Sequence, residues 1–419
     1  MYRTVFFNSN GSGVVFQLDL IQTLAFGGVV LLGGYALRHA IPILARYNLP
    51  APVIGGLVVA LVILFARNHD VTLFQFDTTL QSPLMIAFFT TIGFGASLPL
   101  LKIGGPAVLR FFAIATVFAV LQNLIGMLVA VLFGLNPLFG LLAGSVTLTG
   151  GPATGLAFAP LFEQAGVVGA ASSAVAAAMG GIVLGGIAGG PVSTLLIERY
   201  KLRAPRGAAS AAREVDTVTS RAEQQVVDFD DETDPLAVLK NLTAILVAMW
   251  IGAWVSKGFA ALGMTLPAYI GAMLVAAVMR NVDNVTGWFG LSQRFINEFG
   301  AVVLSLFLAV ALMTLKLWEL SGLAVPLLTI LLVQVVFVSL FCLWPVFPLM
   351  GRDYESAVMS GGFIGFMLGT TANAMAVMRT LVERYGPAPH AFLVAPMVGA
   401  FFIDFTNAII ITIFLNIAT

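Results

Sequence analysis

Charged side chains are scarce in this chain. Only 10% of its 419 residues are Asp, Glu, Lys or Arg, 59% are hydrophobic, and the mean hydropathy is +1.00. Soluble domains carry about 25% charged residues, so this composition excludes an ordinary water-soluble fold and makes lipid the solvent for much of the surface. The formal net charge of +0 also argues against nucleic acid as a partner, because nucleic-acid-binding domains are basic.

Cysteine and histidine are almost absent. The single cysteine, Cys342, excludes an intrachain disulfide and a cysteine metal cluster, and its apolar surroundings predict that it simply packs there. His39, His69 and His390 lie near the ends of expected helices, and we interpret them as interfacial. No convergent acid, base and nucleophile set is present, so we expect neither enzyme activity nor a cofactor. The P-loop pattern is missing too, which excludes ATP-driven pumping by this chain.

Apolar stretches suited to membrane-crossing helices occur ten times. A bilayer core of about 30 Å needs about 20 apolar residues in a helix. Residues 1–13 are polar and lack the basic start and apolar core of a signal peptide, so we expect a mature end. Residues 199–235 are polar and charged and predict a linker. The expected spans are residues 16–37, 52–66, 83–101, 109–133 and 167–196 before the linker, and 236–262, 267–279, 299–315, 323–350 and 390–415 after it.

Two further apolar stretches, residues 137–163 and 354–383, are crowded with Gly, Ser and Thr near their middles. In the first of them, Pro152 removes a backbone donor and interrupts a helix. Interrupted backbone at membrane depth is tolerated only where protein or a water-filled cavity satisfies its polar groups. We therefore expect both stretches to be re-entrant hairpins.

Basic residues are distributed unevenly between alternate loops of this arrangement. With the N-terminus outside, 16 of the 20 Lys and Arg residues fall on one side of the membrane and 4 on the other. Loops rich in Lys and Arg stay in the cytoplasm. The pattern predicts a multi-pass protein of the bacterial inner membrane with both termini outside and the central linker in the cytoplasm.

The two halves of the chain repeat at a nearly constant offset. Five spans in each half would make the second half inverted relative to the first, the architecture of many secondary transporters. We therefore expect an all-α polytopic membrane protein of about ten transmembrane helices, in two inverted five-helix repeats (residues 1–198 and 236–419), each with a re-entrant hairpin. The matching residues, separated by 217, 212 and 220 positions, are Pro50 and Pro267, Gln122 and Gln334, and Glu163 and Glu383.

Hydroxyl, amide and glycine residues gather at the two hairpin interruptions, which we expect to meet near the membrane midplane. Glycine allows close approach of a ligand to the backbone, and a helix N-terminus after the interruption attracts an anionic group. Close helix packing around small residues is the alternative. The predicted substrate-binding residues are Thr147, Thr149, Gly150, Gly151, Thr154 and Gly155 in the first hairpin, and Gly369, Thr370, Thr371 and Asn373 in the second.

Asp404 is the one carboxylate expected near the middle of a span. Placing a charged side chain at the centre of a bilayer costs roughly 2.5–3.5 kcal/mol by insertion scales. A carboxylate at that depth is therefore expected to have a function. We predict that Asp404 binds sodium with Asn407, which shares its helix face, and with Ser145; a structural hydrogen bond between helices is the alternative. A proton relay normally needs a chain of titratable groups, which is missing. Other polar residues in apolar spans either line the path or hydrogen-bond between helices: Gln122, Asn123 and Gln334.

Four stretches, residues 83–89, 304–309, 312–319 and 395–404, resemble the bacterial sodium:glutamate symporter family, and the resemblance extends over nearly the whole chain. It implies sodium-driven uptake of L-glutamate, and a homodimer with one moving transport unit per protomer. The hairpin tips match the family's pattern at Gly150, Gly151, Thr154, Gly155, Gly369 and Thr371, and depart from it at Pro152, Phe363, Ala372 and Asn373.

Because these departures fall at the expected binding site, a sodium-coupled carrier of another dicarboxylate or amino acid is an alternative. A passive channel is a more distant one. It would need a continuous polar pore or a ring of charges, whereas the sequence has only two local polar interruptions.

Overall fold

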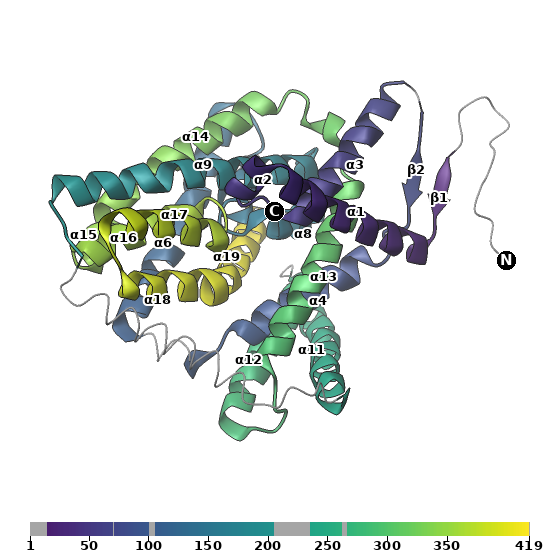
Figure 1. Ribbon diagram of the computed structural model, residues 1–419. Helices are drawn as coiled ribbons and strands as arrows, with labels where there is room; N and C mark the ends of the chain where they lie inside the picture. The colour runs from purple at the N-terminus through teal and green to yellow at the C-terminus, as the bar shows by residue number, and fades with distance from the viewer. Residues whose placement is uncertain (1–14, 70, 100–104, 205–234, 262–265, 419) are drawn as a thin grey trace.

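The computed structural model describes residues 15–69, 71–99, 105–204, 235–261 and 266–418. The expected N-terminal stretch and residues 205–234 of the expected linker lie outside these ranges. Within them the chain is dominated by helices (Figure 1). Those before the linker are α1 (Leu20–Ala40), α2 (Pro42–Arg46), α3 (Ala51–Arg67), α4 (Gln81–Gly95), α6 (Gly105–Leu132), α7 (Pro137–Leu141), α8 (Gly151–Gln164) and α9 (Ala170–Arg199). Those after it are α11 (Pro235–Ala261), α12 (Ala268–Thr286), α13 (Gln293–Met313), α14 (Ala324–Phe341), α15 (Phe347–Met350), α16 (Tyr354–Met367), α17 (Thr371–Tyr385), α18 (Pro389–Met397) and α19 (Ile403–Ala418).

Six of the described helical segments are long and apolar enough to cross a membrane: α1, α6, α9, α11, α13 and the run from α14 to α15. α3 and α19 are shorter apolar helices. Large apolar side chains such as Leu32, Leu128 and Trp250 are exposed on the outer faces of these helices. Such continuous apolar surface is compatible with lipid and not with water, so the chain is a multi-pass membrane protein.

The first expected span, residues 16–37, does not begin as a helix, and the fold is not entirely helical. Phe16–Leu18 (β1) pairs in parallel with Phe74–Phe76 (β2). Asp19 then starts α1 with a capping box, in which its carboxylate accepts from the Gln22 amide at 2.8 Å. The expected span rests on a count of apolar residues, and Phe16 and Leu18 of the strand are apolar too. The count therefore places the start of the helix at residue 16, before its true start at Leu20.

Two of the expected spans contain interruptions. The run from α14 to α15 leaves helical geometry at Trp344 (φ −157°, ψ 121°). The last span changes to a wider turn at Val398–Phe402, between α18 and α19. Trp344 directly precedes Pro345, and the turn at Val398–Phe402 follows Pro396. Proline has no backbone N–H to donate to the helical hydrogen bonds, so each proline favours the interruption beside it.

The helices pack as two groups, which lie on different sides of the molecule in Figure 1. The framework group consists of α1, α3 and α4 with α11, α12 and α13. The hairpin group consists of α6 to α9 with α14 to α19, packed around the two interrupted stretches. Each group takes helices from both halves of the sequence. The groups touch where α13 meets α8 and where α4 and α12 meet α19.

Glycines set two close helix crossings within the framework group. A Cβ on Gly34 would lie 2.1 Å from a backbone oxygen of α3, and one on Gly55 would lie 2.2 Å from a backbone oxygen of α1. Gly252 and Gly271 make the same kind of contact between α11 and α12, with backbone atoms 2.3 Å from the added Cβ. Gly34 precedes Gly252 by 218 residues and Gly55 precedes Gly271 by 216. The helix packing therefore follows the offset of the sequence repeat.

Candidate functional site

Both expected hairpins are helix pairs with an interruption between them. In the first, a wider turn at Leu142–Val146 contains Gly144, which leaves helical geometry (φ −97°, ψ −132°), and α8 starts after residue 150. Pro152 lies in the first turn of α8, where the missing N–H has no intrahelical acceptor to lose. In the second, Thr370 caps α17, and its hydroxyl accepts from the Asn373 backbone amide at 3.3 Å.

The two interruptions lie next to each other. A Cβ on Gly151, whose φ is +69°, would lie 4.0 Å from the Gly369 carbonyl oxygen. Gln122 in the middle of α6 connects the two. Its Oε1 accepts from the Thr149 hydroxyl at 2.8 Å, and its Nε2 donates to the Met367 carbonyl at 3.0 Å. Both partners, Thr149 and Met367, lie close to the interruptions, so one buried amide connects both tips.

Ser145, just before the first tip, is held by two buried amide side chains. Its backbone N–H donates to Asn123 Oδ1 at 2.8 Å, and its carbonyl accepts from Asn407 Nδ2 at 2.8 Å. In the described structure, Ser145 Oγ, Asn407 Oδ1 and Asn123 Nδ2 have no hydrogen-bond partner. An unpaired buried polar atom costs about 1–3 kcal/mol. The cluster therefore holds two unsatisfied oxygens beside the tip, the atom type that hard cations prefer.

Asp404 lies in the first turn of α19, nearly one turn before Asn407. Side chains three residues apart on a helix share a face. None of the three ion pairs in the described part of the chain involves Asp404. Its charge is therefore not matched by a lysine or arginine at the interruptions.

Within the first hairpin, the predicted residues differ in what their side chains contact. The Thr147 hydroxyl donates to the Leu142 carbonyl at 2.8 Å, and its methyl group faces Gly155. Thr154 packs against Gly150, on which a Cβ would lie 2.6 Å from the Thr154 Cβ. Thr147 and Thr154 thus help to shape the turn, and Gly150 and Gly151 remain at the tip.

In the second hairpin, Thr370 and Thr371 are half-buried, and a Cβ on Gly399 would lie 2.9 Å from the Thr371 hydroxyl. Thr371 therefore faces the wider turn before α19. Asn373 is buried, and its Nδ2 donates to the Ile182 carbonyl of α9 at 2.9 Å. The nitrogen of the Asn373 side-chain amide is thus hydrogen-bonded within the protein.

Gln334 is not equivalent to Gln122 in its bonding, although the two occupy matching sequence positions. Its Nε2 donates to the Gln122 carbonyl at 2.7 Å, and its Oε1 has no partner in the described structure. Both glutamines are fully buried. Hydrogen bonding between helices is one of the two expectations for these residues. It involves both polar atoms of the Gln122 side chain and only the nitrogen of Gln334.

The prediction that Phe363 belongs to the second tip is wrong. Phe363 is fully buried in α16 and packs against Phe111, Phe118 and Phe341, with ring centroids 5.5, 5.4 and 6.1 Å away. An aromatic cluster of this kind is core packing. The departure from the family's pattern at this position therefore lies away from the meeting point of the tips.

Sequence reasoning missed two polar groups. The Met367 carbonyl belongs to an apolar residue, so no side-chain signal points to it. Tyr269 is buried between Phe89 of α4 and Phe158 of α8, at ring distances of 4.9 and 5.2 Å, and its hydroxyl has no partner in the described structure. It lies where the two helix groups meet. The sequence signal that could have pointed to Tyr269 is its position as the one tyrosine in the otherwise apolar span expected at residues 267–279.

Interrupted helices that meet inside a multi-pass membrane protein are the binding-site architecture of secondary transporters. The profile of the Sodium/glutamate symporter family matches residues 16–387. The chain is 40% identical over 402 residues to the Sodium/glutamate symporter of Escherichia coli (strain K12), covering 96% of this chain and 98% of that protein. It is 39% identical over 399 residues to the Sodium/glutamate symporter of Haemophilus influenzae (strain ATCC 51907 / DSM 11121 / KW20 / Rd), covering 95% and 97%.

Among solved structures, the sodium proton antiporter MjNhaP1 from Methanocaldococcus jannaschii aligns with a TM-score of 0.43 and 16% identity, covering 95% of this chain and 98% of that one. The sequence relationships are decisive because they extend over nearly the full length. The chain belongs to the sodium/glutamate symporter family, which confirms the resemblance seen in the sequence.

Proposed function

We propose that this protein is a secondary active transporter that couples inward movement of Na⁺ to uptake of L-glutamate across the bacterial cytoplasmic membrane. The observation that carries the proposal is the meeting of two interrupted helices at Gly151 and Gly369, in a chain 40% identical to relatives named sodium/glutamate symporters. Discontinuous helices supply unpaired backbone groups to substrate and ion at one point in the membrane. Transport, rather than catalysis, is the activity that such a site supports.

The sodium site that we propose is formed by Ser145 Oγ, Asn407 Oδ1 and the Asp404 carboxylate. The first two oxygens are buried and unpaired, and Asp404 shares a helix face with Asn407. Oxygen donors from hydroxyl, amide and carboxylate groups suit a hard monovalent cation. Sodium in this place would neutralise Asp404 and satisfy both unpaired oxygens.

The substrate carboxylates, in this proposal, face the N-termini of α8 and α17. Residues 137–163 and 354–378 contain no Lys or Arg, so positive charge must come from other sources. The first N–H groups of each helix have no intrahelical acceptor and carry the positive end of the helix dipole. The half-buried hydroxyls of Thr370 and Thr371 and the co-bound sodium would complete the anion site.

For the membrane arrangement, we propose ten spans in two inverted halves, residues 1–198 and 236–419. The linker, residues 199–235, then lies in the cytoplasm and both termini lie outside. The pairing of β1 with β2 supports this arrangement, because two crossings by α1 and α3 bring both strands to the same side. We also propose a homodimer, and alternating access by movement of the hairpin group against the framework group.

The test is uptake of radiolabelled L-glutamate into proteoliposomes, with and without an inward sodium gradient. Concentrative uptake that requires the gradient, and that neither aspartate nor neutral amino acids inhibit, is the expected result. Uptake that only equilibrates would indicate a passive channel.

A carrier of another dicarboxylate or amino acid is the second candidate. It is favoured by Pro152 and Asn373, which lie at the tips and depart from the family's pattern. Absence of glutamate uptake, in protein whose melting temperature still rises with sodium, would select this candidate.

A further inference from the structure

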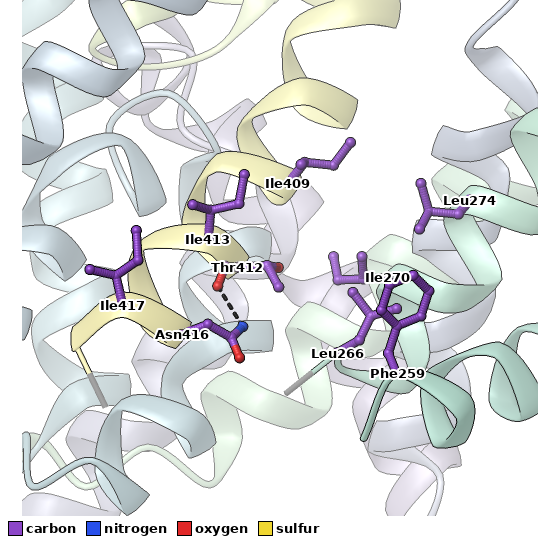
Figure 2. Close-up of a pocket in the computed structure, with 9 residues that line it drawn as sticks. All are labelled: Phe259, Leu266, Ile270, Leu274, Ile409, Thr412, Ile413, Asn416 and Ile417. Carbon is purple, nitrogen blue, oxygen red and sulfur yellow. Dashed lines mark hydrogen bonds between the residues drawn. The ribbon is translucent and has the colours of Figure 1, made fainter. Parts of the chain in front are cut away.

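A cavity of about 390 Å³ lies between the framework group and the hairpin group (Figure 2). One wall comes from α12, through Ile270 and Leu274, and from Leu266, two residues before that helix. The opposite wall comes from α19, through Ile409 and Ile413 among others. Figure 2 shows the two walls facing each other across an open space.

The cavity is elongated. Its lining residues recur every three or four positions, at 266, 270 and 274 on one wall and from 409 to 417 along α19 on the other. Eight residues of helix extend about 12 Å at 1.5 Å per residue. The space is therefore a slot between two helical stripes.

The lining of the slot is almost entirely apolar. The Thr412 hydroxyl donates to the Ala408 carbonyl at 2.8 Å, and Asn416 Nδ2 donates to the Thr412 carbonyl at 2.8 Å. The other lining residues are aliphatic or, at Phe259, aromatic. Because burying a charged or polar molecule without partners is costly, glutamate and sodium are excluded. The slot suits a hydrocarbon chain.

The rim of the slot faces lipid. Ile413 and Ile417 are 52% and 79% exposed on α19, in a multi-pass membrane protein. At the same end of α11 as Phe259, exposed Lys257 places its ammonium 5.6 Å from the centroid of the exposed Trp254 ring. Basic and aromatic side chains together mark the headgroup level of a membrane. The Phe259 end of the slot therefore lies near the headgroups, and the remainder extends among the acyl chains.

We propose that the slot between α12 and α19 binds one acyl chain of a membrane phospholipid, wedged between the framework and hairpin groups. A void lined by side chains forfeits dispersion contacts on its open side, and an acyl chain restores them. Because Ile409 follows Asn407 by two residues on α19, the bound chain packs against the helix that carries the proposed sodium ligands. The binding itself does not depend on which solute the protein carries.

The test is photolabelling of the full-length protein in vesicles of phosphatidylethanolamine and phosphatidylglycerol doped with a phospholipid carrying a diazirine near the end of its acyl chain. Adducts are mapped by peptide mass spectrometry. We expect adducts on Leu274 and Ile409, which are half-buried on opposite walls of the slot, several-fold above those on Ile330, which is fully buried in α14.

Leu274→Trp fills the slot from one wall and should reduce adducts on Ile409 several-fold. Ile409→Phe fills it from the other wall, should reduce adducts on Leu274, and serves if the first variant does not fold. Leu332→Trp, on the exposed face of α14, is the matched control and should leave them unchanged. Labelling of Leu274 and Ile409 at the level of Ile330, or labelling of the opposite wall that persists in the filled variants, would overturn the proposal.

Discussion

The side-chain amide of Asn407 donates a hydrogen bond of 2.8 Å to the carbonyl oxygen of Ser145, 262 residues earlier in the chain. The same carbonyl accepts from the Gly150 backbone amide at 2.9 Å. The last described helix is thereby attached to the turn that precedes the first tip. Each of these two residues also has a buried oxygen without a hydrogen-bond partner in the described structure, Asn407 Oδ1 and Ser145 Oγ. The first prediction concerns the Ser145 hydroxyl.

Ser145→Ala removes the hydroxyl and keeps all three of the backbone hydrogen bonds described for Ser145, with Asn123, Asn407 and Gly150. We expect the sodium concentration for half-maximal uptake to rise about tenfold, which corresponds to a loss of about 1.4 kcal/mol of ion binding. The melting temperature without sodium should not change, because the hydroxyl has no protein partner. Ser173→Ala is the control, since Ser173 Oγ is also buried and unpaired but lies in α9. Equal sodium dependence in the two variants would remove Ser145 from the ion site.

Asp404→Asn keeps the shape of the side chain and removes its charge. We expect a higher sodium requirement for uptake, because a cation loses its anionic partner in a medium where charge pairing is strong. The measurement is the sodium dependence of initial uptake rates in vesicles containing equal amounts of folded protein. Unchanged sodium dependence would show that Asp404 is not a ligand.

Gln122→Leu and Gln334→Leu should differ in stability although their sequence positions correspond. Gln122→Leu loses the bonds to both tips and leaves the Met367 carbonyl buried without its partner. We expect a cost of about 2–3 kcal/mol. Gln334→Leu loses one bond and also removes an oxygen that was unpaired, so we expect about 1 kcal/mol or less. Thermal unfolding in detergent measures both, and the reverse order would refute this account of the tips.

Gly34→Ala and Gly33→Ala form a matched pair on one helix. A methyl group at Gly34 would lie 2.1 Å from the Ala51 carbonyl oxygen, whereas nothing lies within 4 Å of one at Gly33. Overpacking costs about 1–3 kcal/mol, so Gly34→Ala should lower the melting temperature and Gly33→Ala should not. Equal melting temperatures would mean that α1 and α3 are further apart than described.

Single cysteines test the membrane arrangement, with the buried Cys342 replaced by alanine. Under the proposed topology, Thr78→Cys reacts with a membrane-impermeant maleimide in intact cells, and Trp288→Cys reacts only after lysis. Both positions are exposed in short connections between helices. Reaction of both from the same side would contradict the inverted ten-span arrangement.

Much of this fold was predictable because its signals are local. Apolar length and the positions of glycine and proline act within one helix, so each of the ten expected spans overlaps a described helix or an interrupted helical run. The hairpin interruptions were found for the same reason, since Gly, Thr and Pro cluster at residues 147–152 and Gly and Thr at 369–371. β1 was missed because pairing with β2 depends on a segment 58 residues away.

The sequence by itself determined that the chain is a membrane protein of the sodium/glutamate symporter family with two interrupted stretches, because composition, helix length and motif identity need no knowledge of neighbours. Only the tertiary structure decided which polar atoms are available to a ligand. The side-chain nitrogen and oxygen of Gln122 each have a partner, Met367 and Thr149. The Asn373 side-chain nitrogen is bonded to Ile182, and Ser145 Oγ is left unpaired. The partner residues lie as many as 262 positions away, and their pairing is decided by long-range packing.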